Sequence, residues 1–166
     1  MKCRHCQSEL TVSLIDLVTS PPSNAYLTQQ ELQATEKYFP LRVLVCTDCW
    51  LVQTEDYAGA DELFSSDYAY FSAFSSSWLK HSEQYVINMV DRFDLDGQSY
   101  IVEVAANDGY LLQYVKARGI PCLGIEPTTS TADAARKKGI EIIEDFFGVE
   151  LANKMVEQGE QADLTA

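Results

Sequence analysis

Basic residues are scarce in this sequence, and their scarcity limits what the protein binds. The 166 residues include 12 Lys and Arg against 25 Asp and Glu, which gives a net charge of −13. Nucleic-acid binding needs basic side chains on the phosphates, and adsorption to an anionic membrane surface needs them as well. The composition therefore argues against nucleic acid and membrane as partners.

Long apolar runs are also missing. No stretch approaches the ~20 apolar residues of a transmembrane helix, and the N-terminal Met-Lys-Cys-Arg-His-Cys is not followed by the apolar region of a signal peptide. With 46% hydrophobic and 22% charged residues, the chain is expected to fold. A cytoplasmic protein is the default expectation, whereas the oligomeric state is not indicated.

A strand, a tight turn and a helix are predicted between residues 101 and 118. The stretch that starts at Ile101 begins with apolar and β-branched residues, as buried parallel strands do, and Asn107, Asp108 and Gly109 then turn the chain. Ligands of open parallel sheets bind in the crevice outside the carboxyl ends of the strands. These three residues are expected to lie in that crevice, with Gly109 letting the backbone approach a ligand closely.

An acidic residue follows at the end of the next predicted strand. In nucleotide-binding βαβ units, an acid about 20 positions after the glycine-rich turn accepts hydrogen bonds from the ribose hydroxyls. Glu126 lies at a comparable distance from Gly109, and Pro127 ends the strand. A buried strand with a solvated Glu at its tip is the alternative. The two signals inside one unit favour a nucleotide site.

The glycines of a dinucleotide fingerprint are absent from that site. The pattern Gly-x-Gly-x-x-Gly gives room to a pyrophosphate, whereas the corresponding positions hold Ala105, Asn107 and Tyr110. A ligand without phosphate fits better, and S-adenosylmethionine is such a ligand. Its carboxylate suits backbone N–H groups, and its amino group suits an acid such as Glu103.

Four of the five cysteines form two Cys-x2-Cys pairs, Cys3 with Cys6 and Cys46 with Cys49. Two such pairs complete a tetrahedral Zn²⁺ site. Disulfides are disfavoured in a cytosolic protein, and a redox Cys-x2-Cys is expected beside a thioredoxin-like pattern. A structural zinc site is therefore predicted, with His5 as a bystander and with a β-hairpin that carries the second pair at its tip.

The chain resembles the sugar C-methyltransferases, S-adenosylmethionine-dependent enzymes of deoxysugar biosynthesis with an N-terminal zinc-binding domain. The resemblance rests on residues 103–112 and 124–127, and on Pro-Pro-Ser-Asn-Ala-Tyr, Tyr-Phe-Pro-Leu and Cys-x2-Cys-x-Leu-Val-Gln around the cysteines. It implies an α/β fold with a zinc-binding domain at 1–66. The first half of a Rossmann-like S-adenosylmethionine-binding sheet would follow at 67–166.

The resemblance also implies binding residues. It places the Tyr-x-Tyr-Phe-Ser segment over the cofactor, and a sugar nucleotide against the zinc domain at Ser23, Asn24 and Tyr26. A structural loop over the zinc hairpins is the alternative reading of those three residues. The complete set of cofactor candidates, from the residues and the resemblance together, is Tyr68, Tyr70, Ser72, Glu103, Asn107, Asp108, Gly109, Leu111, Glu126, Pro127 and Phe146.

The implied reaction is C-methylation of a nucleotide-linked keto-deoxysugar. A base removes the proton next to the ketone, and the resulting enolate takes the methyl group. In the resembled family the base follows the part present here, so this segment is expected to lack it and to be inactive alone. The alternatives are a non-catalytic zinc-ribbon interaction module with a vestigial nucleotide-binding fold, and a nicotinamide-dependent oxidoreductase, which the missing glycines disfavour.

The remaining elements follow from periodicity and capping signals. A helix is predicted at 76–92, with one apolar face against the sheet and a cap at Ser75 or Ser76. A short helix is expected within 29–35, and others at 110–118, 132–138 and 148–158. Short strands are expected at 122–125 and 140–143, and a further one begins at 162–164.

Overall fold

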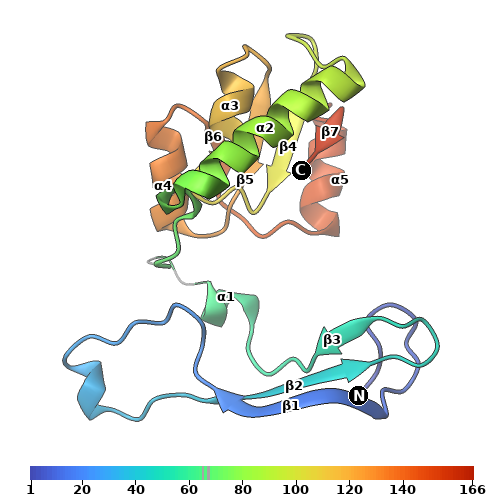
Figure 1. The fold of residues 1–166 in the computed structure, drawn as a ribbon, viewed down its shortest axis with the longest axis vertical. Helices are drawn as coiled ribbons and strands as arrows, with labels where there is room; N and C mark the ends of the chain where they lie inside the picture. The colour runs from blue at the N-terminus through green and yellow to red at the C-terminus, as the bar shows by residue number, and fades with distance from the viewer. Residues whose placement is uncertain (65, 67) are drawn as a thin grey trace. The chain divides into compact units, whose positions relative to one another are not determined.

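The computed structural model describes residues 1–64, 66 and 68–166, which form two compact units (Figure 1). The N-terminal unit is Met1–Leu63 and the C-terminal unit is Phe64–Ala166. The domain boundary expected from the sequence, between 66 and 67, involves Asp67, which lies outside the described residues.

The N-terminal unit contains a three-stranded antiparallel sheet of β1 (Val12–Ser20), β2 (Phe39–Val45) and β3 (Val52–Thr54), in that order. The predicted hairpin around the second cysteine pair is present as β2 and β3. The sequence did not predict β1, because this edge strand has nearly all its residues exposed and two register shifts interrupt its pairing.

Short helical elements complete this unit. A 3-10 helix covers Glu31–Gln33, where a short helix was expected within 29–35. The helix α1 covers Ala60–Leu63.

The C-terminal unit is built on a four-stranded parallel sheet, which confirms the predicted α/β, Rossmann-like class. Its strands are β4 (Ile101–Val104), β5 (Cys122–Ile125), β6 (Glu141–Ile143) and β7 (Leu164–Thr165). They lie in the order β6-β5-β4-β7. The chain therefore adds strands on one side of β4 and then returns to its other side, which is the strand reversal beside which such sheets bind ligands.

Helices cover both faces of this sheet. The helices are α2 (Ser76–Phe93), α3 (Leu112–Lys116), α4 (Thr129–Lys137) and α5 (Val149–Glu157). Side chains of α2, α3 and α4 pack with Ile101 and Ile140 in one core cluster, and α5 packs with Val102 and Leu123 in another. Because α5 returns the chain across β4, a right-handed crossover places it on the opposite face.

The helix α2 follows the prediction in its limits but not along its whole apolar face. The hydroxyl of Ser75 accepts a hydrogen bond from the Trp78 N–H (3.2 Å) and caps the helix. Ser82 and Val86 are buried, whereas Trp78 and Phe93 are 43% and 51% exposed. The middle of the predicted face therefore makes the contact with the core.

The helix α3 is shorter than the range 110–118 expected from the sequence. It begins at Leu112, because residues 107–111 stay in turns. Asn107 and Gly109 in these turns have φ of 49° and 73°, values outside the right-handed helical region. Among the helices that the structure describes, none combines the length and apolar character needed to cross a membrane.

Candidate functional site

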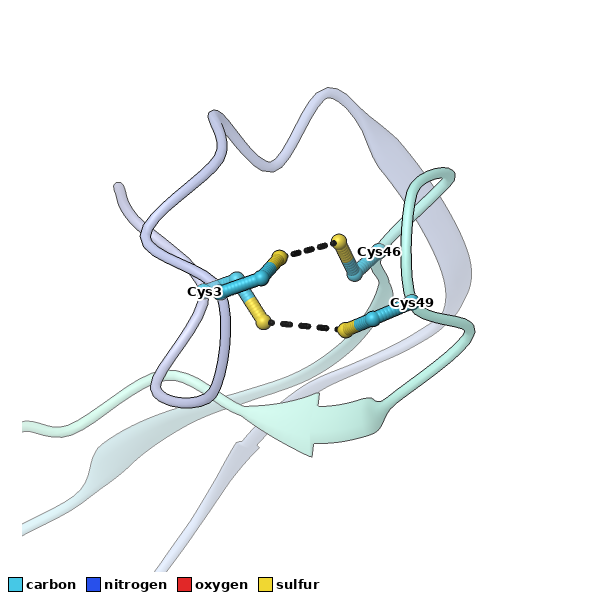
Figure 2. A group of neighbouring side chains, drawn as sticks. Cys3, Cys46 and Cys49 are labelled. Carbon is cyan, nitrogen blue, oxygen red and sulfur yellow. Dashed lines mark hydrogen bonds between the residues drawn. The ribbon is translucent and has the colours of Figure 1, made fainter.

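The four paired cysteines meet in one cluster in the N-terminal unit, and Figure 2 shows the labelled thiols directed toward a common space. Their sulfur atoms all lie within 4.8 Å of one another, with 3.6 Å between Cys3 and Cys49 and 3.5 Å between Cys6 and Cys46. A disulfide needs a sulfur–sulfur distance of about 2.05 Å. Zinc–sulfur bonds of about 2.3 Å separate the sulfurs of a tetrahedral site by about 3.8 Å. The thiols therefore fit a zinc ion, and His5 is not part of the cluster.

Both cysteine pairs use the same backbone turn. The Gln7 N–H donates to the Cys3 carbonyl and the Trp50 N–H donates to the Cys46 carbonyl, each at 3.0 Å. Gln7 and Trp50 both have a φ of 65°. This left-handed residue after the second cysteine closes the turn, so that both thiols of each pair face inward.

Gln53 supports the cluster, although the sequence did not identify it as a site residue. It is 5% exposed, its side-chain N–H donates to the Cys3 sulfur (3.3 Å), and its amide oxygen accepts from the Arg4 N–H (3.1 Å). The Cys6 backbone N–H, together with Gln53, lowers the pKa of the Cys3 thiol to about 6. The thiolate is the form that binds metal. Gln53 is the glutamine that ends the Cys-x-Leu-Val-Gln motif, and its place in that motif could have identified it as a site residue.

A cavity of about 400 Å³ opens in the C-terminal unit at the carboxyl ends of β4, β5 and β6. We call it the larger cavity. Seven of the predicted cofactor residues line it: Tyr68, Tyr70, Ser72, Asn107, Glu126, Pro127 and Phe146. The sequence had not assigned several others, among them Phe64, Val104, Tyr110 and Phe147. Phe147 follows the predicted residue Phe146 directly in the sequence, and this adjacency could have identified it as a cavity residue.

Glu126 is fixed at the rim of the larger cavity by three hydrogen bonds. It is 4% exposed. One carboxylate oxygen accepts from the Asn107 N–H (2.9 Å), and the other accepts from the Thr128 N–H (3.0 Å) and from the Thr128 hydroxyl. The βα turn after β4 and the loop after β5 thus hold the carboxylate in one orientation.

The side chain of Asn107 holds the aromatic segment in place. Its amide oxygen accepts from the Ser72 N–H (2.9 Å), and its amide nitrogen donates to the Tyr70 carbonyl (3.0 Å). The sequence predicted Asn107 as a ligand contact. In the structure its side chain instead binds the backbone of Tyr70 and Ser72 and so holds that segment over the turn.

Gly109 and Asp108 do not line the larger cavity. A Cβ on Gly109 would lie 2.4 Å from the Ile140 side chain and 3.2 Å from Ala135, so this glycine allows the turn to pack against α4 and the residue before β6 rather than against a ligand. Asp108 is 4% exposed and lies 3.5 Å from the Lys138 ammonium. Its Oδ1 atom has no hydrogen-bond partner among the described residues.

A smaller cavity of about 250 Å³ lies beside α2, and Val104 and Tyr110 line both cavities. Glu103 and Leu111, two further predicted cofactor residues, line this smaller cavity. Glu103 is 2% exposed, and burial raises the pKa of its carboxyl to about 8. Its Oε2 atom makes no hydrogen bond within the described part of the chain.

The three residues predicted to bind a sugar nucleotide are not brought together in one hollow. Ser23 lines a cavity of about 320 Å³ in the N-terminal unit, with Pro21, Pro22 and Tyr57. Asn24 and Tyr26 are not among its lining residues, and Tyr26 is 79% exposed.

Comparison with known proteins gives two matches. Residues 3–64 match the methyltransferase-family model described as "Putative zinc binding domain". The C-methyltransferase NovU of Streptomyces niveus is 27% identical over 154 residues, which are 93% of this chain and 36% of that protein. These two matches confirm the resemblance to C-methyltransferases. The chain thus spans about a third of the length of this curated relative. The family match and the cysteine cluster together support the zinc-binding site.

Proposed function

We propose that this chain provides the zinc-binding and cofactor-binding parts of an S-adenosylmethionine-dependent C-methyltransferase that acts on a nucleotide-linked keto-deoxysugar. The carboxylate of Glu126 at the rim of the larger cavity carries this proposal. It lies at the tip of β5, where a Rossmann-like sheet binds ribose hydroxyls. Its three hydrogen bonds hold it ready for such contacts.

Aromatic side chains suit the adenine part of the ligand. Phe146 and Tyr68 line the same cavity as Glu126, and Phe146 is 41% exposed. Stacking on such rings stabilises a bound purine ring. A volume of about 400 Å³ is within the range of small-molecule sites.

The charge of the site favours a cationic cofactor over a dinucleotide. Glu103, Asp108 and Glu126 are all at most 4% exposed and lie around one turn, where Lys138 pairs with Asp108. A pyrophosphate in the larger cavity would meet the buried carboxylate of Glu126 in a medium of low dielectric constant, which is unfavourable. When bound, S-adenosylmethionine supplies an electrophilic methyl group on a cationic sulfur. The residues described here bind and orient it.

The sugar substrate is the less direct part of the proposal. It is supported by the resemblance to sugar C-methyltransferases and by the likeness to a protein named as a C-methyltransferase. The reaction needs a base next to the ketone, and we assign that step to none of the residues that line the two cavities.

Calorimetric titration with S-adenosylhomocysteine, with NAD as the control ligand, tests the cofactor proposal. We expect binding of S-adenosylhomocysteine and none of NAD. Phe146→Ala should weaken binding about tenfold because it removes a stacking surface, while Phe93→Ala, which removes an exposed ring outside the cavity, should leave the affinity unchanged. Binding of neither ligand, with the chain folded, would instead favour a non-catalytic zinc module.

A further inference from the structure

A short segment before α2 forms one wall of the larger cavity, and we call its residues 68–73 the strap. Tyr68, Tyr70 and Ser72 of the strap line the cavity. Apart from Phe64, the other lining residues lie at the ends of β4, β5 and β6 and in the loops that follow these strands. A ligand in the larger cavity is therefore bound between the strap and the sheet.

The side chains of the strap bury little apolar surface. Tyr70 is 52% exposed, and Phe74, directly after the strap, is 88% exposed. Tyr68 and Phe71 are half-buried, and Ser72 is buried. Segments with few buried apolar contacts open at a low cost in free energy. The polar contacts of the strap therefore have a large share in holding it closed.

At its C-terminal end the strap is bound to the turn after β4. The two hydrogen bonds of the Asn107 side chain reach the Ser72 N–H and the Tyr70 carbonyl. The next N–H group, that of Ala73, donates to the Asp108 carboxylate (3.3 Å). In all three bonds the strap contributes a backbone group, so the turn holds its course whatever its side chains do.

At its N-terminal end the strap is bound to α4 through Ser130. The Ser130 hydroxyl donates to the Tyr68 carbonyl (3.0 Å), and the Ser130 N–H donates to the Ser66 carbonyl (3.0 Å). Ser130 lies in the first turn of α4 and is not among the described residues that line the larger cavity. Any effect of its side chain on a ligand in that cavity must therefore pass through the strap.

We propose that Ser130 is a positioning residue of the cofactor site, and that the strap which it holds opens as one unit whenever the cofactor is exchanged. A site that buries most of a small ligand releases it only when part of its wall moves. The wall that moves is the one formed by Tyr68, Tyr70 and Ser72. The inference rests on the proposed function, because the ligand is the adenosyl cofactor bound between the strap and the sheet.

The proposal separates rates from affinity. Loss of the Ser130 hydroxyl increases the fraction of time that the strap is open, and that fraction enters the rates of association and of dissociation alike. Both rates should rise about fivefold, the factor that corresponds to one hydrogen bond. Because the strap still stays mostly closed, the Kd should change less than about twofold. A group in direct contact with the ligand would instead change the Kd.

The first test is amide hydrogen exchange, followed by NMR on the zinc-loaded 166-residue chain without any ligand. Ser130→Ala should speed exchange of the Ser72 and Ala73 amides by the same factor, about fivefold, although the deleted bond lies at the other end of the strap. The control amide is that of Ala106, which donates to the Ile125 carbonyl (3.1 Å) within the sheet. Its exchange should not change.

The second test is stopped-flow binding and displacement of S-adenosylhomocysteine, followed by Trp78 fluorescence in a Trp50→Phe background. Ser130→Ala should raise both rate constants about fivefold, and Ser130→Thr, which keeps a hydroxyl group, should restore them. The matched control is Thr129→Ala in the same turn of α4, because the Thr129 hydroxyl donates to Glu144 rather than to the strap. This control should have the rate constants of the unmodified chain.

The outcomes separate this inference from the proposed function. If S-adenosylhomocysteine binds and Ser130→Ala leaves its release unchanged, the cofactor site stands and the role of Ser130 is wrong. Faster release with unchanged association would indicate a direct contact with the ligand, and it would overturn the inference as well. If S-adenosylhomocysteine does not bind, the proposed function fails and the inference fails with it.

The unmodified chain decides the matter if Ser130→Ala does not fold. A strap that opens as one unit gives the Ser72 and Ala73 amides the same opening constant, and saturation with S-adenosylhomocysteine slows their exchange by equal factors. Different opening constants for these two amides would contradict the inference.

Discussion

The N-terminal unit and the C-terminal unit are each stabilised by a different kind of interior. In the N-terminal unit the buried apolar cluster consists of Cys3, Leu10, Leu44 and Cys46, so half of it is metal-binding sulfur. In the C-terminal unit two larger clusters cover both faces of a parallel sheet. A unit of about 60 residues with so small a core needs another source of stability, and a zinc ion bound by four thiolates supplies it. Metal removal should therefore affect the two units very differently.

Removing zinc is expected to have the largest effect. Structural zinc sites contribute on the order of 10 kcal/mol to folding, so a chelator should unfold the N-terminal unit and leave the C-terminal unit folded. The chain has two tryptophans, Trp50 in the first unit and Trp78 in the second. In Trp78→Phe the fluorescence of Trp50 should shift on chelation, and in Trp50→Phe that of Trp78 should not.

Cysteine variants provide the control for this result. Cys46→Ser should reproduce the effect of the chelator, whereas Cys122→Ser, outside the cluster, should retain about one zinc per chain. Loss of the Trp78 signal on chelation would show that the two units do not fold independently.

A substitution that leaves a void in the core of the C-terminal unit should destabilise that unit and leave the N-terminal unit unchanged. Leu112 is fully buried against the sheet, and Leu112→Ala should cost about 2–5 kcal/mol. Urea denaturation followed by Trp78 fluorescence should record that loss, while zinc content and the Trp50 transition should not change. A zinc content that falls together with stability would contradict the separation of the two units.

The contribution of Gln53 tests how the first unit orients its thiols. Because this buried amide contacts both the Cys3 sulfur and the Arg4 backbone, Gln53→Ala should lower zinc affinity about 10–100-fold. Competition with a colorimetric chelator measures that change. The matched control is Gln84→Ala on α2, which should leave zinc affinity unaltered.

The smallest expected effect concerns the turn after β4. Ala105 has a φ of 59°, a conformation that favours glycine. Ala105→Gly should therefore stabilise the C-terminal unit by about 0.5–1 kcal/mol in urea denaturation. Ala106→Gly is the control at the neighbouring, fully buried position, and it should destabilise the unit because it removes a packed methyl group.

Sequence patterns predicted the parallel strands and the cysteine cluster because local composition determines them. The runs at 101–104 and 122–125 are largely apolar, with Glu103 as the exception, which is typical of strands covered by helices on both sides. The edge strand β1 escaped prediction, since it is exposed, bulged and stabilised by its pairing with β2 rather than by its own pattern.

The sequence indicated some of the residues that line the larger cavity, but not the contacts that these residues make. The sequence indicated Asn107, Gly109 and Glu126, yet the hydrogen bonds of Asn107 to residues 70 and 72 and the packing of Gly109 against Ile140 arise from tertiary structure. Gln53 was missed for the same reason, because its partner Cys3 is distant in sequence. Local sequence patterns thus identify the turn, whereas the contacts that each of its residues makes depend on the tertiary structure.

The most direct test of the account is an amide NMR titration of the zinc-loaded chain with S-adenosylhomocysteine. The account predicts shifts for the amides of Ser72 and Asn107, which line the larger cavity, and of Thr128, whose N–H donates to the Glu126 carboxylate. It predicts none for Gln7 and Trp50 in the cysteine turns. Shifts centred on the cysteine turns, or no shifts anywhere in the C-terminal unit, would contradict the assignment of the cofactor site to the parallel sheet.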